Sequence, residues 1–178
     1  MLELGALTTV PGASMFPRHE MTDEHHQFMR AAIALAEDGL RADHGGPFGC
    51  VIVRNGEIIA RGNNRVTSTN DPTAHAEISA IREACKVLNT FQLADCELYT
   101  TCEPCPMCLS AIYWARIPVV YYGNTRADAA AIGFDDDFIY RQIPMLPGER
   151  TLKMIPLLRE EARHAFAEWH AKEDKVRY

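Results

Sequence analysis

The sequence predicts a single α/β domain in which helices cover both faces of a mixed β-sheet. First, 178 residues with 47% hydrophobic content are enough to bury one core. Second, apolar residues recur at helical spacing in some segments and in short strand-like runs in others. Third, helical segments separate the later strands, and crossover connections of that kind build layered sheets. We expect a mixed central sheet of about five strands.

The first elements in the chain are a helix and a hairpin. The helix is predicted to begin at Thr22 or Asp23 and to end near Gly39, because a capping residue precedes an apolar helical repeat. The runs CVIV and EIIARG then flank Asn55-Gly56, a dipeptide that tolerates positive φ. These runs predict two antiparallel strands joined by a tight turn.

A second helix is predicted over 75–88, where turn and capping residues at 70–73 precede an apolar helical repeat. CELYT predicts a strand, PCPMCLSAIYWAR a helix with prolines in its first turn, and VVYYG another strand. Beyond Asn124 we expect two short helices, at RADAAAIGF and DDDFIYRQI, and a strand-like run in TLKMIPLL. The last segment, REEARHAFAEWHAKEDKVRY, predicts an amphipathic helix with core contacts from Ala162, Phe166, Trp169 and Val176.

Composition and charge limit the partners of this chain. Lys and Arg total 18 against 24 Asp and Glu, and the formal charge of −6 disfavours binding to a phosphate backbone. No stretch has the features of a signal peptide or of a membrane span. We therefore expect a soluble cytoplasmic protein with a small-molecule ligand and with no nucleic-acid or membrane partner. Residues 1–20 are interpreted as an N-terminal extension and 21–178 as the functional domain.

Three cysteines at three-residue intervals, Cys102, Cys105 and Cys108, indicate a metal site. An iron–sulfur cluster would use a fourth cysteine soon afterwards, but Ile112 occupies that position and no cysteine follows Cys108. Zinc fits better, because it accepts thiolate and imidazole ligands, and a catalytic zinc keeps three protein ligands and one open position.

His75 is the histidine best placed to complete such a site. It begins the second predicted helix, and two helices on adjacent crossovers can bring their N-termini together. Cys105 and Cys108 lie one turn apart on one helix face, and a helix N-terminus favours thiolates. Cys102 precedes that helix and is interpreted as a bystander. We therefore predict one zinc ion (Zn²⁺) per subunit, held by His75, Cys105 and Cys108.

Glu77, two residues after His75, is the candidate catalytic residue. In the first turn of a helix it can project beside the metal without binding it. Zinc lowers the pKa of bound water from about 15.7 to about 7, and a nearby carboxylate can carry the released proton. An H-x-E followed by P-C-x-x-C is the signature of zinc deaminases.

HAE at 75–77 and PCPMC at 104–108 resemble the two zinc half-sites of the cytidine deaminase-like superfamily. GGPFGCVIV, NDPTAHAE, CEPCPMCLSAIYWARI and GFDDDFIY resemble its bacterial guanine deaminase branch more closely. The resemblance implies the three-layer cytidine deaminase-like fold. It also implies hydrolysis of guanine to xanthine and ammonia in purine catabolism or salvage, by zinc hydroxide with Glu77 as proton shuttle.

The same resemblance implies five substrate-binding residues. Phe48 would stack on the base, Asn64 would bind its edge, Trp114 would form a wall, and Asp136 would engage the ring or its amino group. Tyr178 would close the pocket of a partner in a domain-swapped homodimer. Four of these residues have structural alternatives: Phe48 and Trp114 as core packing, Asn64 as a turn cap, and Asp136 as part of a solvated acidic turn.

Three other functions stay open at this point. A tRNA adenosine deaminase shares the zinc motif but needs a basic path for the nucleic acid. A deaminase of another heterocycle, such as cytosine or an aminotriazine, would use the same chemistry. A non-catalytic module with a structural zinc would need a fourth ligand, for which Cys102 is the candidate, and would give Glu77 no role. Arg65 stands where the guanine deaminase family often has a second asparagine, so contacts in that loop are also open.

Overall fold

The computed structural model describes residues 22–134 and 136–177. Within them lies a mixed sheet with the strand order β2-β1-β3-β4. β1 pairs antiparallel with β2 and β3, and β3 pairs parallel with β4, so both kinds of ladder occur. The α/β class and the mixed sheet are confirmed. The strands are β1 (Gly49–Arg54), β2 (Glu57–Asn63), β3 (Cys96–Cys102) and β4 (Val119–Asn124).

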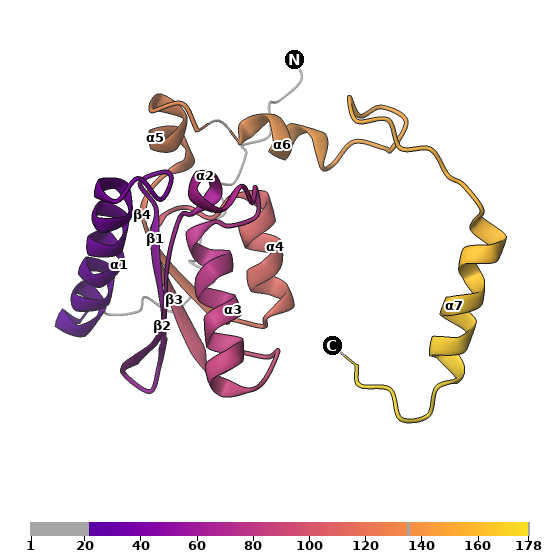
Figure 1. The fold of residues 1–178 in the computed structure, drawn as a ribbon, viewed down its shortest axis with the longest axis horizontal. Helices are drawn as coiled ribbons and strands as arrows, with labels where there is room; N and C mark the ends of the chain where they lie inside the picture. The colour runs from indigo at the N-terminus through magenta and orange to yellow at the C-terminus, as the bar shows by residue number, and fades with distance from the viewer. Residues whose placement is uncertain (1–21, 135, 178) are drawn as a thin grey trace, which may run out of the picture.

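Helices cover both faces of this sheet (Figure 1). α1 packs on one face, and α3 and α4 lie on the other, so the domain has three layers. α4 is the crossover that joins the parallel strands β3 and β4. The helices are α1 (Asp23–Arg41), α2 (Val66–Thr69), α3 (Ala76–Leu88), α4 (Pro106–Trp114), α5 (Arg126–Ala131), α6 (Asp137–Gln142) and α7 (Arg159–Ala171).

Strand alternation divides the core into two parts. Val51 and Val53 of β1 contribute to the cluster under α1, together with Tyr99 of β3. Their neighbours Cys50 and Ile52 contribute to the larger cluster on the α3 and α4 side. Successive side chains on a strand point to opposite faces, so a continuous apolar run is what a sheet covered on both sides requires.

Two local features of the sheet follow from the sequence, the turn between β1 and β2 and the close contact of β2 with α3. Asn55 and Gly56 adopt positive φ (52° and 78°) between β1 and β2, as their sequence predicts. On β2, a Cβ at Gly62 would lie 2.2 Å from the carbonyl oxygen of Ala76. The absence of a side chain at Gly62 therefore lets the first turn of α3 lie directly against the strand, which places the N-terminus of α3.

The prediction of about five strands is wrong for the described chain, in which the sheet has four. The fifth was expected in the run TLKMIPLL, but residues 151–158 form no strand. They lie on an extended segment away from the sheet (Figure 1), where Leu152, Ile155 and Leu157 are 70%, 81% and 81% exposed. The run has strand-forming composition, but none of the four described strands pairs with it.

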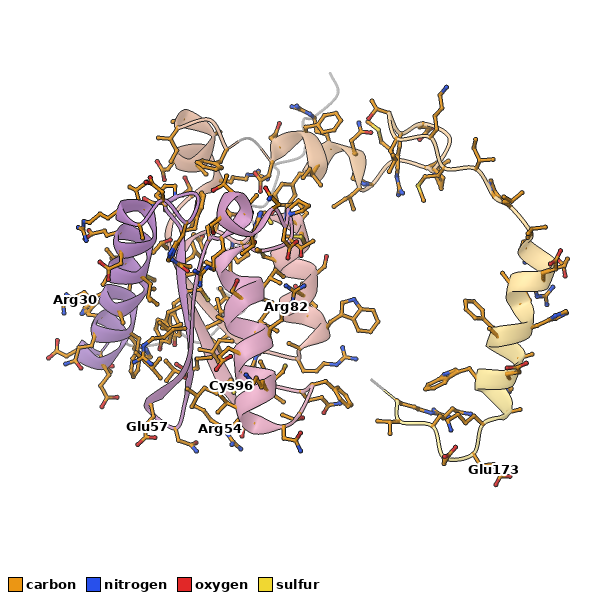
Figure 2. All side chains as sticks on the ribbon, in the orientation of Figure 1. Arg30, Arg54, Glu57, Arg82, Cys96 and Glu173 are labelled. Atoms are coloured by element: carbon orange, nitrogen blue, oxygen red, sulfur yellow. The ribbon has the colours of Figure 1, made fainter. Side chains whose placement is uncertain are left out.

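The amphipathic helix at the C-terminus is confirmed as α7, but its predicted core contacts are wrong. No residue of α7 is buried, and Phe166, Trp169 and Val176 all stay exposed. Figures 1 and 2 show α7 standing apart from the sheet, with side chains directed into open space. Its apolar face therefore has no partner within the described chain. None of the described helices has the length and apolar character needed to cross a membrane.

Candidate metal centre and pocket

Two helix N-termini meet at the metal centre, as the sequence predicts. His75 is the N-cap of α3 and Cys105 is the N-cap of α4, and neither side chain is used for capping. The His75 Nδ1 lies 3.5 Å from the sulfur of Cys105 and 3.5 Å from that of Cys108. Within residues 22–134 and 136–177, these three form the one cluster of His, Cys, Asp and Glu side chains suited to a metal.

The donor set fits a zinc ion. Ligands that lie about 2.0–2.3 Å from a tetrahedral zinc are roughly 3.5 Å apart, which is the spacing that the imidazole keeps from both sulfurs. Cys102 is buried near the end of β3, and its sulfur contacts the backbone oxygen of Thr125 at 3.6 Å instead of joining the cluster. The cluster thus offers three donors, the number that leaves a fourth position open.

The thiols of Cys105 and Cys108 differ in pKa. A hydrogen bond from the Cys108 thiol, reinforced by His75, lowers the pKa of Cys105 to about 4. The same contact, together with burial, raises the pKa of Cys108. The contact with Cys105 also raises the pKa of His75. Cys105 is therefore the first thiolate of the pair, and a bound zinc ion would deprotonate the second thiol as well.

Glu77 lies in the first turn of α3 and is 6% exposed. Its Oε1 accepts a hydrogen bond from the Thr100 hydroxyl at 3.3 Å, and its Oε2 lies 3.5 Å from the Cys108 sulfur. Burial raises the pKa of Glu77 above its ordinary value. The carboxyl group is thus fixed beside the cluster without belonging to it, which is the geometry expected of a proton carrier.

A pocket of about 380 Å³ opens in front of this cluster. Its lining includes His75, Glu77 and Cys105, so any molecule in the pocket meets the metal centre. Three of the predicted substrate-binding residues, Phe48, Asn64 and Asp136, line it too, and they come from three separate parts of the chain. The pocket lies at the end of the sheet opposite the β1–β2 hairpin, which Arg54 and Glu57 mark in Figure 2.

Phe48 forms the apolar side of the pocket with a partner that the sequence did not reveal. Its ring packs edge-on against Phe134, with centroids 4.9 Å apart. A Cβ at Gly46 would lie 2.9 Å from the Phe134 ring and 3.0 Å from the Phe48 ring. The glycine in GGPFG therefore makes room for the aromatic pair. Phe48 also packs against the core under α3, which is its structural alternative, while its stacking on a base stays a prediction.

Asn64 caps a turn, which is its structural alternative, and its contact with a base edge stays a prediction. Its Oδ1 accepts hydrogen bonds from the backbone N–H groups of Gly46 and Val66, each at 3.2 Å. The side chain therefore caps the turn that opens α2 and fixes the glycine loop. Since its oxygen is used in this way, the amide nitrogen is the part of Asn64 that can donate to a ligand.

The three adjacent aspartates separate in the structure. Asp136 is the N-cap of α6, makes no capping hydrogen bond and lines the pocket. Asp137 forms an ion pair with Arg141 on the exposed side of α6. Asp135 lies outside the described residues. Burial, followed by the neighbouring Cys105, raises the pKa of Asp136.

The structure does not place the remaining two predicted residues in the pocket. Trp114 is 61% exposed and is not part of the pocket lining in the described chain. The physical reason is its position at the far end of α4, about 12 Å along the axis from Pro106 at ~1.5 Å per residue. Tyr178 lies outside the described residues.

Glu103 and Arg126 also line the pocket, and sequence reasoning missed them. The backbone N–H of Arg126 donates to Glu103 Oε2 at 3.2 Å, which ties the start of α5 to the loop before Cys105. No motif spacing connects these residues. The only signal was the proximity of Glu103 to PCPMC.

Comparison with known proteins places this architecture in a class. Residues 22–124 match the cytidine and deoxycytidylate deaminase zinc-binding region. That match covers both helix N-termini and all four strands. The chain therefore belongs to this family of zinc-dependent deaminases, as its motifs predict.

The similarity to individual relatives is more specific than the family match. The chain is 53% identical to the guanine deaminase of Bacillus subtilis over 154 residues, which is 86% of this chain and 99% of that protein. The crystal structure of a Bacillus subtilis guanine deaminase superposes with a TM-score of 0.84 at 52% identity, covering 86% of this chain and 98% of the other. A tRNA-specific adenosine deaminase of Agrobacterium fabrum is 46% identical over 61% of this chain and 71% of its own length.

Proposed function

We propose that this protein hydrolyses guanine to xanthine and ammonia with one zinc ion per subunit. The observation that carries the proposal is the similarity to a guanine deaminase over 99% of that protein's length, well past the shared zinc region at 22–124. The pocket supports it, because one wall is aromatic and the polar groups of Asn64 and Asp136 face the same space. Purine catabolism or salvage is the corresponding cellular role, and a cytoplasmic location stays a prediction.

His75, Cys105 and Cys108 hold the zinc ion in this proposal. When bound, zinc supplies an acidified water molecule that acts as a nucleophile near neutral pH. Glu77 accepts one proton of that water and delivers it to a ring nitrogen of guanine. It then takes the second proton from the new hydroxyl group on C2 and delivers it to the departing amino group. The hydrogen bond from Thr100 holds the Glu77 carboxyl group toward the pocket throughout these transfers. Water and guanine are consumed and xanthine and ammonia are formed, so no other reactant is needed.

Three side chains select the base. Phe48, supported by Phe134, presents a flat apolar surface to a heterocycle. The amide nitrogen of Asn64 donates to an acceptor on the base edge, and the carboxylate of Asp136 accepts from ring N–H and amino groups. A pocket built of such groups rejects a wrong base, because its own polar atoms would then stay unpaired.

The rival with a specific observation behind it is a tRNA adenosine deaminase, because such enzymes share the family motif and 46% identity over part of the chain. Among the described pocket residues, the charged groups are mainly acidic, and Arg126 is the one arginine or lysine. This lining lacks a basic path for a nucleic acid and fits a free base better.

Ammonia release from zinc-loaded protein tests the function. The panel is guanine, guanosine, adenine, cytosine, cytidine and an aminotriazine, with Glu77→Gln as the matched control. We expect guanine turnover that falls by roughly 10²–10⁴-fold in the variant while zinc content is unchanged. Turnover of another base alone would reassign the substrate, and silence across the panel would contradict catalysis on free bases.

We also propose that the chain forms a homodimer in which C-terminal segments are exchanged, with Tyr178 closing the pocket of the partner. The apolar residues of the segment after α6 support this, because they are exposed along its whole length. A patch of this kind marks an interaction surface, and exchange of identical elements makes dimers at low cost. The exposed residues are Ile143, Met145, Leu146, Leu152, Met154, Ile155, Leu157, Leu158, Phe166, Trp169 and Val176.

Light scattering coupled to size exclusion tests the dimer. The expected mass is twice the 19.9 kDa of one chain. A chain shortened before the C-terminal segment is expected to run as a monomer. A monomeric full-length chain would contradict the exchange and leave the pocket to be completed from within one subunit.

A further inference from the structure

Helix α6, which begins with Asp136 as its N-cap, is attached to the domain through Tyr140. The Tyr140 hydroxyl donates to the backbone oxygen of Pro104 at 3.1 Å, and Pro104 directly precedes the metal-centre residue Cys105. Tyr140 lies four residues after Asp136, so both share one face of the helix. The place of the Asp136 carboxylate over the pocket therefore depends on how Tyr140 is held.

The side chain of Arg126 contacts the ring of Tyr140. Its guanidinium lies 5.0 Å from the ring centroid, within the range of a cation–π contact. The backbone of Arg126 is itself fixed, since its N–H donates to Glu103 and a reciprocal capping box between Thr125 and Asp128 begins α5. α5, α6 and the loop before Cys105 are thus joined at one point.

Arg126 is also the one arginine or lysine among the described residues that line the pocket. Burial is the largest cause of the raised pKa of the Asp136 carboxyl group. Among the charged neighbours, Cys105 and Glu103 raise that pKa further, and Arg126 lowers it. The Arg126 guanidinium therefore opposes the effect that burial and two neighbouring negative charges have on the pKa of Asp136.

We propose that Arg126, acting through Tyr140, is a positioning residue that holds the Asp136 carboxylate over the pocket and balances its charge. This role rests on the proposed function, in which Asp136 binds the guanine base. It does not involve the metal or the proton carrier. Its loss is therefore felt in base binding and not in zinc affinity.

Steady-state kinetics with guanine tests the role in Arg126→Gln, Arg126→Lys and Tyr140→Phe. In Arg126→Gln we expect KM to rise roughly tenfold, the effect of losing one charge-assisted contact, while kcat changes by less than about threefold. The acid limb of kcat/KM should move to higher pH, because Asp136 without its cation gains a proton more easily. Arg126→Lys keeps the charge and should restore the acid limb but only part of KM, since lysine lacks the planar group.

Tyr140→Phe separates the two contacts, because it keeps the ring under Arg126 and loses the hydrogen bond to Pro104. An increase in KM between those of wild type and Arg126→Gln is expected. Arg141→Gln is the matched control, since Arg141 pairs with Asp137 on the exposed side of α6. It should leave KM and the pH profile unchanged.

Guanine binding in a Glu77→Gln background provides a readout without turnover. There, adding Arg126→Gln should weaken the dissociation constant roughly tenfold, with zinc content unaffected. If wild type deaminates guanine and Arg126→Gln matches Arg141→Gln in KM, pH profile and binding, the positioning role is wrong and the proposed function stands. If wild type itself neither binds nor deaminates guanine, the proposed function and this role both fall.

Discussion

Residues 22–124 and 137–177 differ in how their apolar side chains are used. In the first region, α1, α3 and α4 cover both faces of the sheet, and side chains such as Leu98 and Ile52 are fully buried. In the second region α7 buries no residue, and Leu157 is 81% exposed. Both regions contain strand- and helix-forming sequences. Within the described residues, only the apolar side chains of the first region are buried against other elements.

The difference also separates the metal centre from part of the proposed base-binding site. The metal centre and Glu77 lie wholly within the first region, which is also the part that the deaminase family shares. Among the proposed base-binding residues, Phe48 and Asn64 also lie in the first region. Asp136 borders the second region, and Tyr178 lies beyond it. The family thus shares the metal centre, and we expect the segment beyond 124 to contribute to the choice of substrate.

The largest effect should come from breaking the first region at its metal centre. His75→Ala or Cys108→Ala removes one of three ligands, so zinc and guanine turnover should both be lost. Cys102→Ala is the control, because its sulfur contacts the Thr125 backbone and not the cluster. Metal analysis of purified proteins measures this, and zinc retained by the Cys108 variant at wild-type stoichiometry would refute the ligand assignment.

The next largest effects should come from substitutions of packed side chains in the two regions. Leu98→Ala leaves a cavity in a fully buried site and should lower the free energy of unfolding by roughly 2–5 kcal/mol. Phe166→Ala on α7 should instead weaken association, so that the melting temperature becomes more dependent on protein concentration. Denaturant and thermal unfolding at several concentrations distinguish the two. A concentration-independent loss from Phe166→Ala would place α7 in the core of its own chain.

A smaller effect is expected at the edge of the pocket. A methyl group at Gly46 would lie 2.9 Å from the Phe134 ring and 3.0 Å from that of Phe48, so the aromatic pair must shift. Gly46→Ala should raise KM for guanine severalfold and leave zinc binding intact. Unchanged KM would show that the aromatic pair does not contact the base. Gly148→Ala is a suitable control, because no atom lies within 4 Å of a Cβ built there.

The smallest effect should come from the surface pair Arg54–Asp95, far from the pocket. The hydrogen bond from Arg54 lowers the pKa of Asp95, so the pair stabilises the fold above the unfolded pKa of Asp, about 3.9. This stabilisation is lost as the pH falls through the lowered folded pKa. Arg54→Gln should therefore be slightly less stable than wild type at pH 7 and equal to it in strong acid. A difference that grows with acid would contradict the assignment.

Sequence reasoning succeeded where a local pattern determines the structure. The three metal-centre residues lie where helices begin, and capping residues and prolines in the sequence predict those starts. They are His75, Cys105 and Cys108, and the three-residue spacing of the two cysteines places their sulfurs on one helix face. The Asn55-Gly56 hairpin is another local case, because its positive φ values suit those residues. These elements could be predicted without knowing what packs against them.

It failed where contacts join distant segments. The hydrogen bond between Thr100 and Glu77 joins residues 23 positions apart, and the ring contact between Phe48 and Phe134 spans a still longer interval. No regular sequence spacing predicts either contact. Trp114 was assigned to the pocket by resemblance, but its place at the far end of α4 removes it from the pocket of its own chain. TLKMIPLL has the composition of a strand, but no strand among the described residues pairs with it. Composition does not reveal whether a partner lies in the same chain.

Mixed-subunit complementation tests most directly whether two copies of the chain complete one pocket. Glu77→Gln subunits with an intact C-terminal segment are unfolded and refolded together with subunits that lack Tyr178 but keep Glu77. We expect guanine deamination to return in the mixture, because one pocket of each mixed dimer then has both Glu77 and the partner's Tyr178. Activity no higher than the sum of the two parent proteins, in a mixture shown to contain mixed dimers, would contradict it and place both residues in the same chain.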